Sequence, residues 1–265
     1  DYAITRHYPE CETPGDFLNA VIRAQARLVA KWLSVGFIHG VMNTDNTAIS
    51  GETIDYGPCA FMDDYHPQTV FSSIDVHGRY AYDNQVHVIV WNMAQLASSL
   101  LLLMPDETTA IEDFTKAVNA MPGLIQGYWV QYFGEKIGLE NATLDDEPLI
   151  TDLLELMSAQ KADFTNTFRN LPLENPAFAD WNTRWQVRLR SETGVSARLQ
   201  AANPAFIPRN HRIEQMIQAA LAGDFKPFER LIAVLAHPYE DQPGAHDLTH
   251  PPQPGEVVEN TFCGT

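Results

Sequence analysis

The chain has 265 residues, of which 45% are hydrophobic and 19% are charged. This composition is sufficient for a substantial core and excludes an intrinsically disordered protein. Seventeen basic against thirty-four acidic residues give a formal net charge of -17, which repels a phosphate backbone and provides no attraction to anionic lipid. We therefore expect no nucleic-acid partner and no membrane partner, and a bound nucleotide would need a divalent metal as a bridge.

The N-terminal residues and the cysteines bear on the cellular compartment. Residues 1–8 contain neither an initiating Met nor a basic-then-apolar leader, so we predict no secretion signal and expect the chain to begin within a longer protein. The three cysteines, Cys11, Cys59 and Cys263, are too few and too scattered for a disulfide framework or a structural zinc site. A reducing cytoplasm is the expected location.

The first predicted helix covers residues 17–35, after a capping turn at residues 13–16. Its polar residues recur at helical spacing, so only one narrow face should meet water, and Gly36 is well placed to end it. Residues 47–54 alternate in character around a central glycine, which predicts two very short strands joined by a tight turn. Residues 55–84 are rich in Pro, Gly, Asp and Ser and predict a long ordered loop.

Most of the remaining chain is predicted to be helical. Apolar spacing favours helices near 85–104, 107–121, 124–138, 147–170, 176–192, 210–222 and 224–236. The first of these is strongly apolar, but a stripe of Asn and Ser residues interrupts it, which indicates a buried helix and not a membrane span. The proline-rich tail from His237 is predicted to lie extended over the surface or to be partly mobile.

A polar loop at residues 39–46 carries the most informative pattern. It reads His-Gly-Val-Met-Asn-Thr-Asp-Asn, and the sequence Asp-Tyr-Gly follows at residues 55–57. A divalent metal that bridges a triphosphate prefers hard oxygen ligands, typically one or two carboxylates and an amide oxygen. Asn46 and Asp55 supply such a pair and are the candidate metal ligands, with Asp55 also close to the nucleotide.

The spacing matches the catalytic loop of a protein kinase, in which an Asn lies seven residues after a His and an Asp-Phe-Gly motif follows. Asn46 lies seven residues after His39, and Asp55 stands where the Asp of that motif is expected. The position of the usual catalytic Asp holds Val41, which cannot accept a proton. Asp45 is the nearest carboxylate that could serve as the base instead.

Each of these residues also has a simpler interpretation. An Asp-Asn pair in a loop usually forms a turn, and Asp55 could cap a turn before Gly57. His39 fits a structural residue bonded to the backbone better than a catalytic one. Arg79 could bind a phosphate or a protein substrate, but a buried structural ion pair is at least as good an interpretation. The shared spacing of His39, Asn46 and Asp55 favours the functional interpretation of the loop.

These motifs resemble the signature of the selenoprotein O family of pseudokinases. The similarity continues through Arg6-His7-Tyr8-Pro9, Gly78-Arg79-Tyr80, Asn84-Gln85, Trp91-Asn92, Asn203-Pro204 and Pro238-Tyr239. The resemblance implies a mainly α fold, a protein-kinase-like C-lobe with a short β-hairpin at the active site and a helical C-terminal extension. We expect residues 1–140 to form the C-lobe with its catalytic loop and activation-like segment, and residues 141–265 to form the extension and the extended tail.

The resemblance also implies an activity. Members of this family bind ATP in a flipped orientation and transfer AMP to Ser, Thr or Tyr hydroxyls of proteins, with pyrophosphate as the leaving group. By this resemblance Asp45 is the proton acceptor, while Asn46 and Asp55 hold Mg²⁺, or Mn²⁺ in its place. Only thirty-eight residues precede His39, too few for a kinase N-lobe, so we expect a fragment with weak or no activity alone.

Two other functions stay open at this point. A small-molecule or protein phosphotransferase of kinase-like fold fits the His-Gly opening of the loop, but Val41 counts against it. A non-catalytic pseudokinase scaffold fits Val41, but the retained Asn46 and Asp55 count against that.

The resemblance also suggests a redox pair. The family carries a selenocysteine or cysteine near its C-terminus, where Cys263 lies, and Cys59 follows Asp55. A reversible disulfide between them is one hypothesis, and the alternative is a buried Cys59 with an unpaired Cys263.

Overall fold

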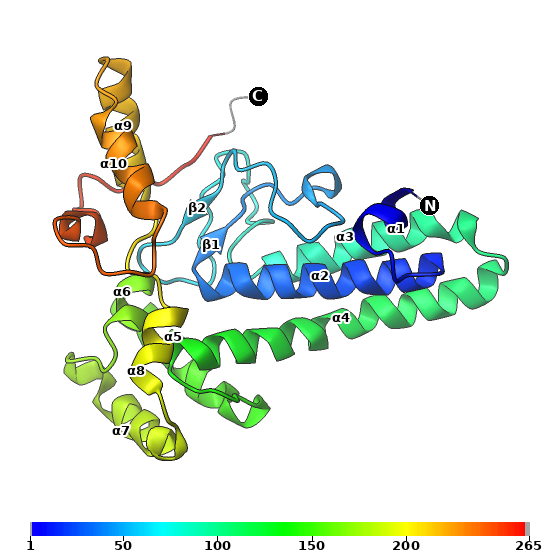
Figure 1. The fold of residues 1–265 in the computed structure, drawn as a ribbon, viewed down its shortest axis with the longest axis horizontal. Coiled ribbons are helices and arrows are strands. Elements are labelled where there is room, and N and C mark those ends of the chain that lie inside the picture. The colour runs from blue at the N-terminus through cyan, green and yellow to red at the C-terminus, as the bar shows by residue number, and fades with distance from the viewer. Residues whose placement is uncertain (1, 263–265) are drawn as a thin grey trace.

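The computed structural model describes residues 2–262, and helices make up most of it (Figure 1). Three long helices lie side by side: α2 (Pro14–Ser34), α3 (Gln85–Leu100) and α4 (Glu107–Lys136). The shorter helices are α1 (Tyr2–His7), α5 (Glu147–Gln160), α6 (Phe164–Arg169), α7 (Ala179–Arg188), α8 (Val195–Ala202), α9 (Asn210–Leu221) and α10 (Lys226–Leu235). The predicted mainly α class is therefore confirmed.

Helix α2 is the predicted first helix, but it begins at Pro14, inside the segment expected to be a turn, and ends at Ser34. The Thr13 hydroxyl accepts a hydrogen bond from the Asp16 amide at 3.1 Å, and the Asp16 carboxylate accepts one from the Thr13 amide at 3.0 Å, which is a complete capping box. Asn19, Arg23 and Arg27 form the exposed stripe, while most of the other side chains are buried. The helix ends before Gly36, whose φ of +71° requires a residue without a Cβ.

The only sheet in residues 2–262 pairs β1 (Phe37–Ile38) with β2 (Ala60–Phe61) in antiparallel register, Phe37 opposite Phe61. The prediction of two strands within residues 47–54 is wrong, because none of these residues belongs to a strand. The segment forms a turn, in which the Gly51 amide donates to Ala48 O at 3.0 Å, and side chains from outside hold it: Gln25 Nε2 donates to Ala48 O at 2.6 Å and the Tyr8 hydroxyl donates to Ile49 O at 2.6 Å. The short sheet thus brackets the loop and does not lie within it.

Two helix boundaries also differ from the prediction. The helices expected at 107–121 and 124–138 are one helix, α4, which continues through Pro122 because Met121 and Ile125 beside it are fully buried in the core. The helix expected at 147–170 is divided after Gln160, where Lys161 takes a left-handed φ of +49° and ends α5. Helices α1 and α8 were not predicted.

Residues Gln85–Leu103 form one helical segment that is long and apolar enough to cross a membrane, judged by length and composition alone. No other such segment occurs within residues 2–262. In the fold this segment packs against α2 and α4 and buries Val88, Ile89 and Met93 in the main core. Only 33% of the segment is buried, and Asn92 of the polar stripe lies on the buried face, so the helix is buried along one face and not all round as predicted.

A buried arginine fixes the start of the long loop that follows β2. The Arg209 side chain is only 1% exposed, and its Nη1 donates both to the Asp63 carboxylate and, at 2.7 Å, to the Asp163 carboxylate. The Phe164 amide donates to Asp63 O at 2.7 Å, and the Tyr65 amide donates to Ala162 O at 2.9 Å. Three parts of the chain that are far apart in sequence therefore meet at one guanidinium group.

The tail returns to this loop. In Figure 1 the red segment runs back toward the loops beside β1 and β2. The Thr261 amide donates to Phe71 O at 2.7 Å, the Ser73 amide donates to Thr261 O at 2.9 Å, and the Thr261 hydroxyl donates to Pro58 O. Residues 237–262 are not extended throughout: they include a short 3₁₀ helix, His246–Thr249, and bury Ala245 and Leu248 in a second small core. The kinase-like C-lobe and its boundary at residue 140 stay predictions.

Replacing Arg209 with Ala should destabilise the fold by about 3–5 kcal/mol, because it leaves the carboxylates of Asp63 and Asp163 without their buried counter-charge. Urea denaturation followed by circular dichroism measures this loss. The control is Arg230→Ala. Arg230 pairs with Asp247, but its side chain is 45% exposed, so this substitution should lower the free energy of unfolding by less than about 1 kcal/mol. Equal losses in the two variants would contradict the anchoring role of Arg209.

Candidate functional site

The loop at residues 39–46 is fixed at its start by the first residue of α3. The His39 amide donates to Gln85 Oε1 at 3.0 Å, and Gln85 Nε2 donates to Phe37 O at 3.0 Å and to Tyr82 O at 3.1 Å. Both Gln85 and His39 are fully buried. Because a buried amide side chain needs its partners, these bonds define the position at which the loop leaves β1.

The His39 ring joins the loop to the segment that contains Asp55. Its Nε2 lies 2.8 Å from Ile54 O, and since a carbonyl only accepts, Nε2 carries the hydrogen. The ring also packs against Trp32, with 5.3 Å between ring centroids. Burial lowers the pKa of His39, while the bond to Ile54 O and the charge of Asp55 act in the opposite direction. The predicted structural role of His39 is confirmed.

Asn46 folds back onto the same part of the loop. Residues Thr44–Asn46 form a short 3₁₀ turn, and Asn46 Nδ2 donates to Val41 O at 3.0 Å. This bond sets the orientation of the amide and leaves Asn46 Oδ1 without a donor among the residues that the structure describes. Asp45 is exposed, and Asn46 is half-buried. The turn therefore presents one free amide oxygen and one free carboxylate.

Asp55 begins a turn that lies against the loop. Its backbone takes a left-handed φ of +53°, uncommon for a residue other than Gly, Asn or Asp, and its side chain is exposed. Three residues later Pro58 comes so close to Gly40 that a Cβ on Gly40 would lie 2.9 Å from Pro58 O. Asn46 and Asp55 are thus each tied to residues 39–41, Asn46 by its own amide and Asp55 through its neighbour Ile54.

The donor set fits a metal that also binds phosphate. Asn46 Oδ1 and the Asp55 carboxylate are hard oxygen donors, and Mg²⁺ is commonly held by one or two carboxylates with phosphate oxygens and water as the other ligands. No group of three or more His, Cys, Asp or Glu side chains within residues 2–262 could hold a metal ion. A metal at this loop would consequently depend on a nucleotide to complete its coordination.

Three residues that shape the loop, Tyr80, Gln85 and Asn92, belong to the short segments that resemble the family, but the sequence predicts no role for them. Asn92 Nδ2 donates to Met42 O at 3.1 Å and to Thr47 Oγ1 at 2.8 Å, and the Tyr80 hydroxyl donates to Asn43 Oδ1 at 2.6 Å. Gln85 is the third. Their sequence signal is a polar residue on the buried face of an apolar helix or loop, where a hydrogen-bond partner is required.

Arg79 lies exposed near this loop. Its guanidinium carbon is 5.1 Å from the centroid of the Trp91 ring, a cation–π contact, and it forms no ion pair with any described residue. The alternative of a buried ion pair is therefore wrong. Trp91 also borders a hollow of about 360 Å³ that is lined by Thr44 and Thr47 of the loop.

Cys59 is half-buried beside this turn, and its thiol donates to Tyr56 O at 3.2 Å. Burial raises the pKa of Cys59 to about 11, which disfavours the reactive thiolate. Cys263 lies outside the described residues. The Cys59–Cys263 disulfide therefore stays a prediction.

Comparisons with known proteins agree with the sequence resemblance. A family model described as "Protein adenylyltransferase SelO" matches residues 1–176. The chain is 55% identical over 273 residues to proteins named "Protein nucleotidyltransferase YdiU" from Ruegeria pomeroyi and from Roseobacter denitrificans, and 50% identical over 290 residues to that of Nitrobacter hamburgensis. These alignments include 100% of this chain but only 58%, 58% and 57% of the relatives, so the chain spans little more than half of their length.

The half-buried thiol of Cys59 should react with iodoacetamide at pH 8 at least about tenfold more slowly than an unstructured cysteine peptide, because its thiolate is disfavoured. Peptide mass spectrometry measures the rate at Cys59 separately from the other cysteines. The same chain in urea is the control and should react at the peptide rate. Equal rates in the native and unfolded chain would contradict a buried Cys59.

His39 should make stability depend on pH. Its pKa in the folded state lies below the ordinary value of 6.5, so its contribution is complete above pH 6.5 and is lost as the pH falls through the lowered value. The free energy of unfolding should therefore drop between pH 7.5 and 5.5 more steeply in the wild type than in His39→Gln, whose amide can still donate to Ile54 O. Parallel pH profiles from urea denaturation would contradict this role.

Proposed function

The chain belongs to the protein adenylyltransferase SelO family, and we propose that it serves the transfer of AMP from ATP to Ser, Thr or Tyr hydroxyls of proteins. The observation that supports this most directly is the attachment of Asn46 and Asp55 to the same short segment, residues 39–41, one by the bond to Val41 O and the other through the His39–Ile54 bond. Both donors are free of other hydrogen bonds among the described residues.

In this proposal Asn46 Oδ1 and the Asp55 carboxylate hold Mg²⁺, or Mn²⁺, together with phosphate oxygens of ATP. The metal, when bound, neutralises charge that develops on the phosphate oxygens. The bond from Asn46 Nδ2 to Val41 O keeps the amide oxygen turned toward the ligand, because a flipped amide would lose this donor. With a net charge of -17, the chain needs such a metal to accept ATP.

Asp45 is the proposed base. The acceptor hydroxyl oxygen forms a bond to the α-phosphorus of ATP, the bond from that phosphorus to the pyrophosphate oxygen breaks, and the hydroxyl proton passes to the Asp45 carboxylate. Val41 cannot take this proton. Asp45 is exposed, adjacent to the proposed ligand Asn46, and has no hydrogen bond to any other residue between 2 and 262 that would compete for its oxygens.

We propose further that this chain is the C-terminal portion of a cytoplasmic enzyme and has weak or no activity alone. It spans 58% of the length of the relatives from Ruegeria and Roseobacter. A kinase-like site needs a glycine-rich loop over the phosphates and a Lys–Glu pair, and we find neither pattern before His39.

ATP labelled separately at the α and γ phosphates tests the reaction in the full-length protein. We expect the α label, and not the γ label, on protein acceptors, and no transfer after removal of divalent metal with EDTA. Asp45→Ala should lower the rate by about 10²–10⁴-fold, as expected for the loss of a general base. The matched control is Asp145→Asn, an exposed aspartate remote in sequence from the loop, which should leave the rate unchanged.

Transfer of the γ label alone would replace this proposal with a phosphotransferase. No transfer of either label by the full-length protein with metal present would favour the scaffold. AMP transfer undiminished by Asp45→Ala would exclude Asp45 as the base but keep the reaction.

A further inference from the structure

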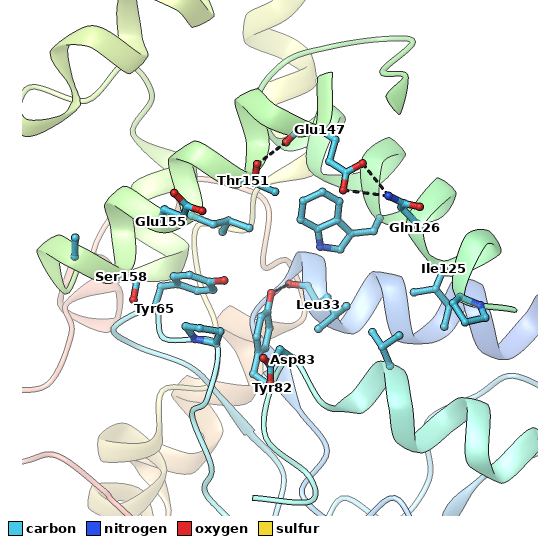
Figure 2. Close-up of a pocket in the computed structure, with 16 residues that line it drawn as sticks. Leu33, Tyr65, Tyr82, Asp83, Ile125, Gln126, Glu147, Thr151, Glu155 and Ser158 are labelled. Carbon is cyan, nitrogen blue, oxygen red and sulfur yellow. Dashed lines mark hydrogen bonds between the residues drawn. The ribbon is translucent and has the colours of Figure 1, made fainter. Parts of the chain in front are cut away.

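A cavity of about 670 Å³ lies apart from the candidate site, between α4, α5, the end of α2 and the loop residues around Tyr65 and Tyr82 (Figure 2). None of residues 39–61 lines it. Its volume is in the range of small-molecule sites, about 300–1,000 Å³. The proposed AMP transfer gives this cavity no role.

The walls of the cavity are mainly apolar and come from separate elements. Leu33 of α2, Val86 of α3, Ile125 and Trp129 of α4 and Leu154 of α5 contribute to them. Tyr82 also lines the cavity, but its hydroxyl is used by the fold, since it donates to Leu33 O at 2.6 Å. Such a mixture of aliphatic and aromatic side chains suits an apolar ligand body.

Tyr65 differs from Tyr82 in having no partner for its hydroxyl. Its side chain is only 8% exposed, it points into the cavity, and its oxygen has no hydrogen bond to any described residue (Figure 2). The ring is held by Tyr82 and Phe164, with centroids 5.8 and 5.9 Å away. Burial raises the pKa of Tyr65 to about 12, so the group remains a phenol that can accept and donate. The hydroxyl oxygen faces the open cavity, where a ligand or water can supply its hydrogen-bond partner.

The charged groups of the cavity all have the same sign. Asp83, Glu147 and Glu155 line it, and the lining includes no Lys, Arg or His among the residues that the structure describes. Glu147 accepts a hydrogen bond from Gln126 at 2.8 Å, which is a neutral donor, and Glu155 has no hydrogen bond or ion pair within the described chain. Asp83 likewise accepts from a neutral amide, that of Gln68.

We propose that this cavity binds a small organic cation with an aromatic or apolar body. The body would pack against Trp129 and the aliphatic walls, and its ammonium group would meet the exposed carboxylate of Glu155 and the free oxygen of Tyr65. Glu147 lies eight residues away at the other end of the α5 wall and would add negative potential without contacting the same ammonium group. No basic residue of the lining neutralises the carboxylates of Asp83, Glu147 and Glu155. The cavity therefore attracts a cationic ligand and repels an anionic one. The inference does not rest on the AMP-transfer proposal.

Three indoles that differ only in the end group test the charge requirement by calorimetry on the chain itself. Tryptamine carries an ammonium group, tryptophol a hydroxyl and indole-3-propionate a carboxylate. We expect tryptamine to bind with a dissociation constant below about 1 mM, tryptophol to bind at least tenfold more weakly, and indole-3-propionate not to bind detectably.

Variants locate the binding. Removing both carboxylates with Glu147→Gln and Glu155→Gln should weaken tryptamine at least tenfold and leave tryptophol unchanged, and Tyr65→Phe should weaken tryptamine about threefold. Ala159→Trp, which fills the cavity from α5, should abolish binding of both. The matched control removes two exposed charges on α4, Glu112→Gln and Asp113→Asn, and should bind tryptamine like the wild type. Circular dichroism verifies that each variant is folded.

Equal affinities for the three indoles would overturn the proposal, because they would show no preference for a cation. No binding of tryptamine up to about 5 mM, which would mean a binding free energy weaker than about 3.1 kcal/mol, would also overturn it. So would tryptamine binding that Ala159→Trp and the double carboxylate variant leave intact, since the ligand would then lie elsewhere.

Discussion

Arg209 is fully buried, and its two partners, Asp63 and Asp163, belong to segments that precede it by 146 and 46 residues. A guanidinium group in the interior is tolerated only when charged acceptors surround it, so its position dictates where both segments must lie. Asp63 lies two residues after the end of β2, and Asp163 caps α6 by accepting a hydrogen bond from the amide of Asn166 at 2.7 Å. The loop that leaves the candidate site, the α5–α6 turn and the start of α9 are therefore built around one charge.

The loops at the candidate site are shaped by side chains that reach across from helices, with little strand pairing. Gln25 and Trp32 of α2, Gln85 and Asn92 of α3, and Tyr8 after α1 each bond to a group in residues 37–53. A single side-chain bond fixes one backbone group and leaves its neighbours free to take unusual conformations. Asp55, whose neighbour Ile54 is held by the His39 ring, takes such a left-handed backbone.

The same feature explains what the sequence could and could not predict. The helix periods of α2 and α10 survive in the structure because each helix buries one apolar face, and the spacing from His39 to Asn46 and Asp55 predicts the loop from the sequence. The prediction of strands in residues 47–54 was wrong because the alternating pattern there comes from contacts with α2. Such a pattern looks the same in the sequence as one that comes from strand pairing. The prediction of two helices separated near Pro122 was wrong because burial of the neighbouring side chains in the core outweighs the helix-breaking effect of the proline. The sequence around Gln85 indicates that it needs a partner but does not say that the partner is the His39 amide, and nothing near Tyr65 indicates that its hydroxyl has none.

The contact of Thr261 with Pro58 joins residues 203 positions apart in the chain. Closing a loop of that length costs conformational entropy that only the prior packing of the intervening helices can reduce. The tail should therefore seat late in folding, after α2 to α10 have taken their places, and the surroundings of Asp55 are completed by the last segment to arrive. Kinetically, the chain would acquire its helical core before it acquires a finished candidate site.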